Sequence, residues 1–168
     1  MASCSTGQYL LAGGSDDFLY TSDDFGSSWV QRTASTRSSW VSVASSSNGS
    51  LLIAAEASGY LHISKDYGSR WSAWTEGIVD NYPYQSWVAV ASSSNGSLLV
   101  AAADGAYIQV SYDYGSSWRG FPGTVGRFCA FAMDRWDVNF SWAQVIGILS
   151  RAWTVQGPLT PCLSGFSS

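Results

Sequence analysis

The chain has 168 residues, enough to bury the core of one domain. Only 12% of the residues are charged, whereas 15% are aromatic, with nine Trp. Few charges together with many aromatic and β-branched side chains argue against disorder and favour β-structure. The net charge is −4 and Lys65 is the only lysine. Because binding through phosphate contacts needs clustered cations, we expect no nucleic-acid binding.

The start of the chain and its cysteines give no sign of export or of metal binding. Residues 1–11 lack a basic stretch followed by a long apolar run, so we expect no secretory signal peptide. No segment approaches the roughly 20 apolar residues of a membrane span. The cysteines, Cys4, Cys129 and Cys162, match neither a zinc pattern nor a disulfide framework. We expect buried or incidental thiols, with a Cys129–Cys162 bridge as the alternative.

A long internal repeat is the strongest signal in the sequence. Residues 38–55 read SSWVSVASSSNGSLLIAA, and residues 85–102 read QSWVAVASSSNGSLLVAA, 47 residues further on. An earlier copy covers residues 7–29 and lies 42 residues before the middle one, as the spacing of Asp24 and Asp66 shows. Similarity at a spacing of 42 to 47 residues indicates one supersecondary unit used several times.

The middle repeat predicts four short strands, over residues 40–44, 51–55, 60–64 and 70–75. Asn48-Gly49 between the first two predicts a type I′ turn, in which both central residues need a positive φ. Four strands in about 45 residues are typical of one propeller blade. The strands are apolar at nearly every position, as expected if stacked blades bury both faces of each sheet. A single blade cannot cover both of its faces and should not be stable alone.

One motif, S-x-D-x-G-x-x-W, occurs three times, at residues 22–29, 64–71 and 111–118. It resembles the Asp box, or bacterial neuraminidase repeat. The Asp can accept hydrogen bonds from N–H groups two or three residues on, and the Gly supplies a positive φ. The Trp can bury its ring while its indole N–H reaches a carbonyl. We interpret the motif as structural, rather than as calcium-binding or catalytic. Its residues are Ser22, Asp24, Gly26, Trp29, Ser64, Asp66, Gly68, Trp71, Ser111, Asp113, Gly115 and Trp118.

The resemblance implies an all-β fold, a partial β-propeller of about three four-stranded Asp-box blades. Asp-box propellers resemble sialidases and other glycoside hydrolases, sortilin-type receptor domains and assembly factors of photosystem II. The blade repeats would occupy residues 1–127, and residues 128–168 would be a degenerate blade or a docking tail. Because propellers of this kind differ in function, the fold alone does not fix the activity.

Catalytic residues are not recognisable in the sequence. The resemblance to sialidases would imply an arginine triad, a Tyr nucleophile supported by Glu, and an Asp acid, but neither Glu56 nor Glu76 has such a context. We interpret Asp16-Asp17 as a hairpin turn rather than a metal site. His62 is expected to be a partly exposed strand residue. We therefore expect no catalytic, cofactor-binding or metal-binding residues, no cofactor and no enzyme.

A binding role is the remaining interpretation. The connection over residues 75–85 is longer than its counterpart at residues 31–37 and gathers Tyr82, Pro83 and Tyr84, which form a candidate binding loop. A packed connection between blades is the alternative reading. Met1 aligns with Val43, so the first blade is expected to have lost its innermost strand.

Three blades are fewer than the four to eight of usual propeller rings. The chain could be a fragment of a longer propeller, it could self-associate, or a protein partner could cover its open blade faces. We predict a non-enzymatic protein-interaction or scaffold module, a subunit or assembly factor of a larger complex. The alternative is a carbohydrate-binding or glycosidase-derived, sialidase-like propeller fragment, with a glycan as ligand.

Overall fold

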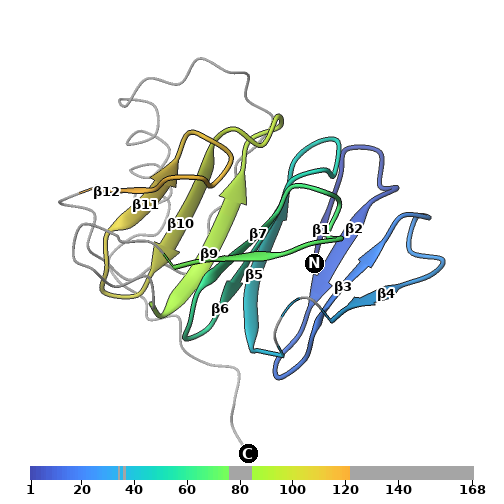
Figure 1. The fold of residues 1–168 in the computed structure, drawn as a ribbon, viewed down its shortest axis with the longest axis horizontal. Helices are drawn as coiled ribbons and strands as arrows, with labels where there is room; N and C mark the ends of the chain where they lie inside the picture. The colour runs from blue at the N-terminus through green and yellow to red at the C-terminus, as the bar shows by residue number, and fades with distance from the viewer. Residues whose placement is uncertain (34, 36, 76–84, 122–168) are drawn as a thin grey trace, which may run out of the picture. The chain divides into compact units, whose positions relative to one another are not determined.

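The computed structural model describes residues 1–33, 35, 37–75 and 85–121, and the structural statements that follow concern these residues. They form three four-stranded antiparallel sheets, which Figure 1 shows side by side in chain order. No helix occurs among them, and so none is long and apolar enough to cross a membrane. The predicted fold class, an all-β partial β-propeller, is confirmed.

Each sheet is one blade, with its strands paired in the order of the chain. Blade 1 contains β1 (Ala2–Ser3), β2 (Leu10–Gly13), β3 (Leu19–Ser22) and β4 (Val30–Arg32). Blade 2 contains β5 (Trp40–Ser45), β6 (Leu52–Glu56), β7 (Leu61–Ser64) and β8 (Ser72–Trp74). Blade 3 contains β9 (Trp87–Ser92), β10 (Leu99–Ala103), β11 (Ile108–Ser111) and β12 (Arg119–Phe121).

The first blade keeps part of its innermost strand, which corrects the expectation that this strand is lost. β1 has two residues, whereas β5 and β9 have six each. Ala2 and Ser3 pair with Leu11 and Leu10 of β2. Two residues suffice for pairing because the hairpin that follows them is the same as in the other blades.

The Asn-Gly hairpin is not the type I′ turn that the sequence suggested. Gly49 has a φ of 78°, but Asn48 is not among the residues with positive φ. The Gly49 N–H donates to the Ser46 carbonyl at 3.0 Å, so the turn proper is one residue earlier and the glycine follows it. The Asn48 Oδ1 accepts hydrogen bonds from the Ser46 hydroxyl, the Ser50 hydroxyl and the Ser50 N–H, which explains the preference for Asn here.

The apolar core lies between successive blades rather than within any one of them. Between blades 1 and 2, buried Leu11 and Leu19 pack against Leu52 and Ala54. A larger cluster joins blades 2 and 3 in the same way. All residues of β6 and β10 are buried. For β6 the reason is that blade 2 lies between blades 1 and 3, which cover both faces of its sheet.

Candidate functional site

The three S-x-D-x-G-x-x-W hairpins have the same internal hydrogen bonds. In the first, Asp24 Oδ1 accepts from the Ser22 hydroxyl and from the Ser28 N–H, both at 2.8 Å, and the Ser22 hydroxyl accepts from the Gly26 N–H at 2.9 Å. The amide that reaches the carboxylate is four residues on, rather than two or three. Asp66 and Asp113 repeat the pattern. The carboxylates are therefore occupied within their own loops.

These hydrogen bonds favour the charged form of each Asp. The hydroxyl and the N–H of Ser28, with the Ser22 hydroxyl, lower the pKa of Asp24 to about 2. For Asp66 and Asp113, burial raises the pKa, but the hydrogen bonds of the loop outweigh it, and the net pKa lies below its usual value. An acid with so low a pKa holds no proton to donate near neutral pH.

The hydrogen bonding and the exposure of the motif Trp differ from blade to blade. The Trp71 indole N–H donates to the Gly68 carbonyl at 3.0 Å, as the sequence suggested. The Trp118 indole N–H is buried without a hydrogen-bond partner among the described residues. The Trp29 side chain is 39% exposed, whereas Trp71 and Trp118 pack against the preceding blade. Among the described residues, no blade precedes blade 1 to cover Trp29 in the same way.

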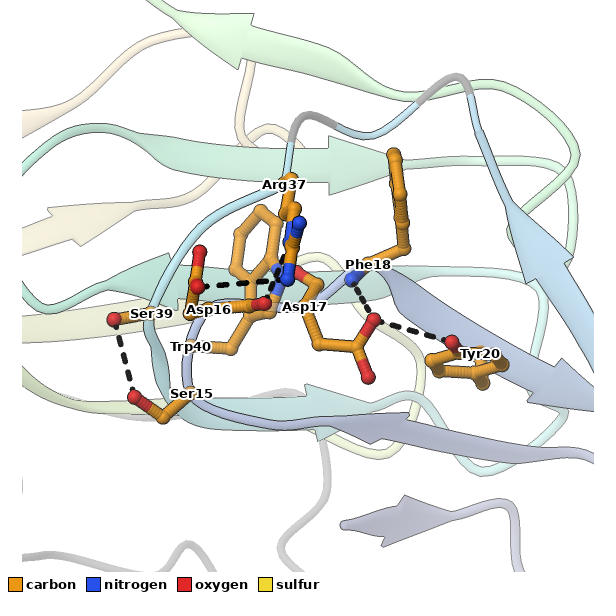
Figure 2. A network of polar contacts seen from close by, with 8 residues as sticks. All are labelled: Ser15, Asp16, Asp17, Phe18, Tyr20, Arg37, Ser39 and Trp40. Carbon is orange, nitrogen blue, oxygen red and sulfur yellow. Dashed lines mark hydrogen bonds and ion pairs between the residues drawn. The ribbon is translucent and has the colours of Figure 1, made fainter.

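At the opposite end of the blades, a Trp joins each blade to the one before it. Figure 2 shows Trp40 beside the turn at Asp16-Asp17, where its indole N–H donates to the Asp17 carbonyl at 2.8 Å. The Arg37 Nε donates to the Asp16 carbonyl at 2.7 Å in the same loop. Trp87 repeats the contact with Gly59 at 3.0 Å. The two acidic residues thus lie in a turn between β2 and β3, with Asp16 at a φ of 54°.

His62 is buried, which corrects the expectation that it is partly exposed. Its Nε2 lies 3.0 Å from Glu56 Oε1, and Glu56 Oε2 accepts from the Tyr60 N–H at 3.0 Å. The Trp40 ring packs edge-on against the imidazole. Burial lowers the pKa of His62, and the nearby Glu56 carboxylate opposes that shift. The Glu56 carboxylate and the His62 imidazole are therefore hydrogen-bonded to each other inside blade 2.

Metal-binding side chains are not gathered in the part of the chain that the structure describes. No group of three or more His, Cys, Asp or Glu residues there could hold a metal ion. Cys4 is a free, buried thiol that replaces the serine of the other hairpins. Burial raises the pKa of the Cys4 thiol, whereas hydrogen bonds with Thr6 and Tyr9 lower it. The hydrogen bonds have the larger combined effect, so the net pKa lies below its ordinary value of 9.0. Cys129 and Cys162 lie outside the described residues.

The joints between successive blades are the feature that repeats most closely. The Ser5 N–H donates to the Ser47 carbonyl at 2.8 Å, and the Ser47 N–H donates to the Ser94 carbonyl at 2.7 Å. These three serines are equivalent positions, 42 and 47 residues apart. Blade 1 therefore donates a main-chain hydrogen bond to blade 2, and blade 2 donates the equivalent one to blade 3.

Two glycines in blade 2 and two in blade 3 receive side chains from the preceding blade. A Cβ on Gly49 would lie 2.7 Å from the Cβ of Tyr9, and a Cβ on Gly68 would lie 2.7 Å from the Thr21 methyl carbon. In blade 3, Leu51 contacts Gly96 and Ile63 contacts Gly115 in the same way. At Gly49, Gly68 and Gly115 an added Cβ would lie closer than 3.0 Å to these side chains, and at Gly96 it would make a tight contact of 3.1 Å. We call the two positions the glycine seats of a blade.

In blade 1 both glycine seats are empty. Gly7, the counterpart of Gly49, has no heavy atom within 4 Å of an added Cβ. Gly26, the counterpart of Gly68, has only Leu10 and Trp29 of its own blade nearby. Among the described residues, all three blades carry this pair of glycines, but side chains of a preceding blade contact the pair in blades 2 and 3 alone.

The side chains around the empty seats are exposed or half-buried. Leu10, Ala12 and Tyr20 are half-buried, whereas their counterparts in blades 2 and 3 are fully buried. Together with Gly7, Gly26 and Trp29 they form what we call the outer face of blade 1. None of these residues is charged. An uncharged sheet face with open seats is suited to packing against another polypeptide.

The binding loop proposed from the sequence and the outer face of blade 1 are different parts of the chain. The candidate binding loop, Tyr82, Pro83 and Tyr84, lies outside the described residues. Open blade faces were predicted from the sequence, but the residues that form the outer face of blade 1 were not identified there. What the alignment could not show is which glycines receive side chains, because those contacts cross from blade to blade.

Comparisons with known proteins identify the fold. No protein-family model matches the sequence, and no curated protein matches it. The structure is similar to YCF48 bound to D1 peptide, with a TM-score of 0.59 and 18% identity, over 75% of this chain and 42% of that one. It is also similar to YCF48 from Cyanidioschyzon merolae, with a TM-score of 0.54 and 19% identity, over 71% and 35% of the two chains.

A glycoside hydrolase has the same architecture. The GH74 enzyme of Niastella koreensis is similar with a TM-score of 0.57 and 19% identity, over 73% of this chain and 18% of that one. The chain therefore spans less than half the length of each of these proteins. At identities this low, the likeness shows a shared propeller fold and not a shared activity.

Proposed function

We propose that this chain is a non-enzymatic protein-interaction module that docks a protein partner on the outer face of blade 1. The observation that carries the proposal is the pair of empty glycine seats at Gly7 and Gly26. The same seats are filled in both blades that have a predecessor. Burying apolar surface contributes about 25 cal/mol per Å² of favourable free energy. A partner that covers the exposed part of this face would therefore form a stabilised complex with the chain.

The chemistry of the described residues supports a binding role over a catalytic one. The three motif carboxylates are engaged in their own hairpins, and Glu56 and His62 pair with each other. A structural neighbour, YCF48, is known in a complex with a peptide, D1. By analogy, we propose that the present chain acts as a subunit or assembly factor within a larger complex.

The proposal is tested by blocking the outer face and following a partner. Gly7→Asn places an amide in the open seat, and Asn tolerates a left-handed backbone better than other side chains. Gly105→Asn is the matched control, because Gly105 has a similar φ (69° against 77°) and also has open space around it. We expect a stoichiometric partner to co-purify with the native chain and with Gly105→Asn, and to be lost with Gly7→Asn. A partner retained equally by both variants would contradict the proposal.

A further inference from the structure

We propose that the hairpins carrying the S-x-D-x-G-x-x-W motif form a binding surface for a neutral polysaccharide. The surface is built on Phe25, Tyr67 and Tyr114, which follow the Asp of the motif in blades 1, 2 and 3. We call these three residues the aromatic row. This surface is distinct from the outer face of blade 1, and the proposal goes beyond the proposed function.

The most exposed aromatic side chains gather on these hairpins. Phe25 is 68% exposed, Tyr67 is 42% exposed and Tyr114 is 46% exposed. Trp29 and Tyr112, the other two strongly exposed aromatic residues among those described, lie on the same hairpins. Blades 2 and 3 each have a preceding blade, so a missing neighbour does not explain the exposure of Tyr67 and Tyr114. Exposed aromatic rings gathered on one set of loops are typical of a binding surface.

The backbone of the aromatic row is strained although the fold does not need a ring there. The three φ values are 62°, 59° and 59°, where Gly or Asn is accommodated at a lower cost. The main chain is held without the side chains, because each N–H of the row donates to the first hairpin of its own blade. The carbonyls of Gln8, Ser50 and Ser97 accept these hydrogen bonds at 3.2, 3.1 and 3.3 Å. Strained residues that a fold retains cluster at ligand sites, so the same costly choice in three blades indicates a use for the rings.

The hairpins of successive blades are near enough to bind one extended ligand together. The Lys65 Nζ of blade 2 donates to the Ser116 hydroxyl of blade 3 at 2.9 Å, which joins two of the hairpins directly. The Tyr67 ring packs on the ring of Tyr9 in the preceding blade, with 4.7 Å between the centroids, and this contact restricts its orientation. A ligand made of repeating units can place one unit on each ring, and the linked contacts strengthen one another.

The charges around the rings favour a neutral ligand. The three motif segments contain four aspartates, against Lys65 and Arg70 as their only cations. The motif carboxylates are ionised, because the hydrogen bonds of their hairpins lower their pKa values. This excess of negative charge would repel phosphate and sulfate groups.

The polar groups beside the rings favour a ligand that carries hydroxyls. Each motif carboxylate keeps lone pairs beyond those used in its hairpin, and a carboxylate can only accept hydrogen bonds. The hydroxyls of a sugar donate hydrogen bonds, and its C–H groups can pack on the negative face of an aromatic ring. A proline-rich peptide also packs on aromatic rings, but its prolines have no N–H to donate. An exposed serine lies two residues after each ring, at Ser27, Ser69 and Ser116.

The experiment measures how dissolved polymers retard the full chain in native gels. The neutral probes are hydroxyethylcellulose, galactomannan and soluble starch, and at least one of them should retard the native chain. Heparin, which is anionic, and poly-L-proline should not. The proposal would be overturned if none of the neutral probes retarded the chain, or if heparin or poly-L-proline retarded it equally.

Variants of the aromatic row show whether the rings make the contact. Phe25→Asn, Tyr67→Asn and Tyr114→Asn keep the left-handed backbone, because Asn tolerates it. Each change alone should raise the dissociation constant for the retarding probe roughly fivefold, and the three together should abolish retardation. Val41→Asn is the matched control, because it also removes an exposed apolar side chain, and it should bind like the native chain.

Two further measurements separate the loss of ring contacts from a loss of folding. Tyr67→Phe combined with Tyr114→Phe keeps both ring faces and should leave the affinity within about twofold of the native value. The urea midpoint of the triple Asn variant should equal or exceed that of the native chain, since strain is relieved. Normal binding by the triple variant, lost binding by the double Phe variant, or a lower urea midpoint in the triple variant would each contradict the proposal.

Discussion

At the residue scale, three aromatic side chains occupy a backbone region that bulky residues rarely adopt. Phe25, Tyr67 and Tyr114 follow the Asp of each motif and have φ values of 62°, 59° and 59°. All three are exposed. The left-handed region costs an L-residue roughly 1–2 kcal/mol, and Asn bears this cost better than an aromatic residue does.

We therefore expect Phe25→Asn to raise the free energy of unfolding by about 1 kcal/mol. Phe25 is 68% exposed, so little packing is lost, and its N–H can still donate to the Gln8 carbonyl. The measurement is the urea midpoint. Val41→Asn is the control, because Val41 is also exposed but lies in a strand, where Asn should lower stability. A loss of stability in Phe25→Asn would show that the ring makes contacts that offset its strain.

The buried His62 gives the stability of the protein a pH dependence. Its folded pKa lies below the ordinary value of 6.5, mainly because of burial, so between the two values the unfolded state binds more protons. The contribution of His62 is complete above pH 6.5 and is lost as the pH falls through the folded pKa. Urea midpoints should decrease from pH 7.5 to pH 5.5.

The variant His62→Gln should make that decrease smaller. Gln stands at the same position of blade 3, as Gln109, so the side chain fits a blade of this kind. An identical pH dependence in the variant would assign the effect to another group.

At the element scale, substitutions at the glycine seats can distinguish the cost of backbone strain from the cost of lost packing between blades. Gly26, Gly68 and Gly115 all have a positive φ, so an Ala at any of them bears a similar strain. At Gly68 and Gly115 the new methyl would also collide with Thr21 and Ile63 of the preceding blade.

We expect Gly115→Ala and Gly68→Ala to lose about 1–3 kcal/mol more stability than Gly26→Ala, which is the cost of overpacking a tight contact. Thermal or urea unfolding of the three variants gives the comparison directly. Equal losses at the three positions would mean that something already fills the seat at Gly26.

The elements themselves were largely predictable from the sequence, for a physical reason. The repeat supplies several copies of each strand and turn, and strands buried on both faces are apolar throughout, so their limits were predicted within a residue or two. The hairpin at Asn48-Gly49 was assigned the wrong turn type, because the hydrogen bonds of the Asn48 side chain depend on three-dimensional geometry. The burial of His62 was missed because its partner Glu56 lies on the neighbouring strand. The glycine seats were missed because they are properties of two blades together.

At the scale of the whole molecule, the blades should differ in local stability. Blade 2 is covered on both faces by its neighbours, whereas blade 1 has an open outer face. Local opening is easier where fewer apolar contacts hold a sheet in place.

Amide hydrogen exchange should show this difference. Amides in β2 and β3 should exchange roughly tenfold faster than the equivalent amides in β6 and β7, which corresponds to a difference of about 1.4 kcal/mol in opening free energy. Equal protection in the two blades would indicate that the outer face of blade 1 contributes little to opening.

The relay of main-chain hydrogen bonds through Ser5, Ser47 and Ser94 has a consequence for how such molecules grow. Because both described joints use the same main-chain atoms, inserting or deleting a whole repeat would preserve this hydrogen bond. This main-chain contact therefore does not distinguish one joint from the other, and the side chains of the joints carry the difference: Tyr9 and Thr21 at the first joint, and Leu51 and Ile63 at the second.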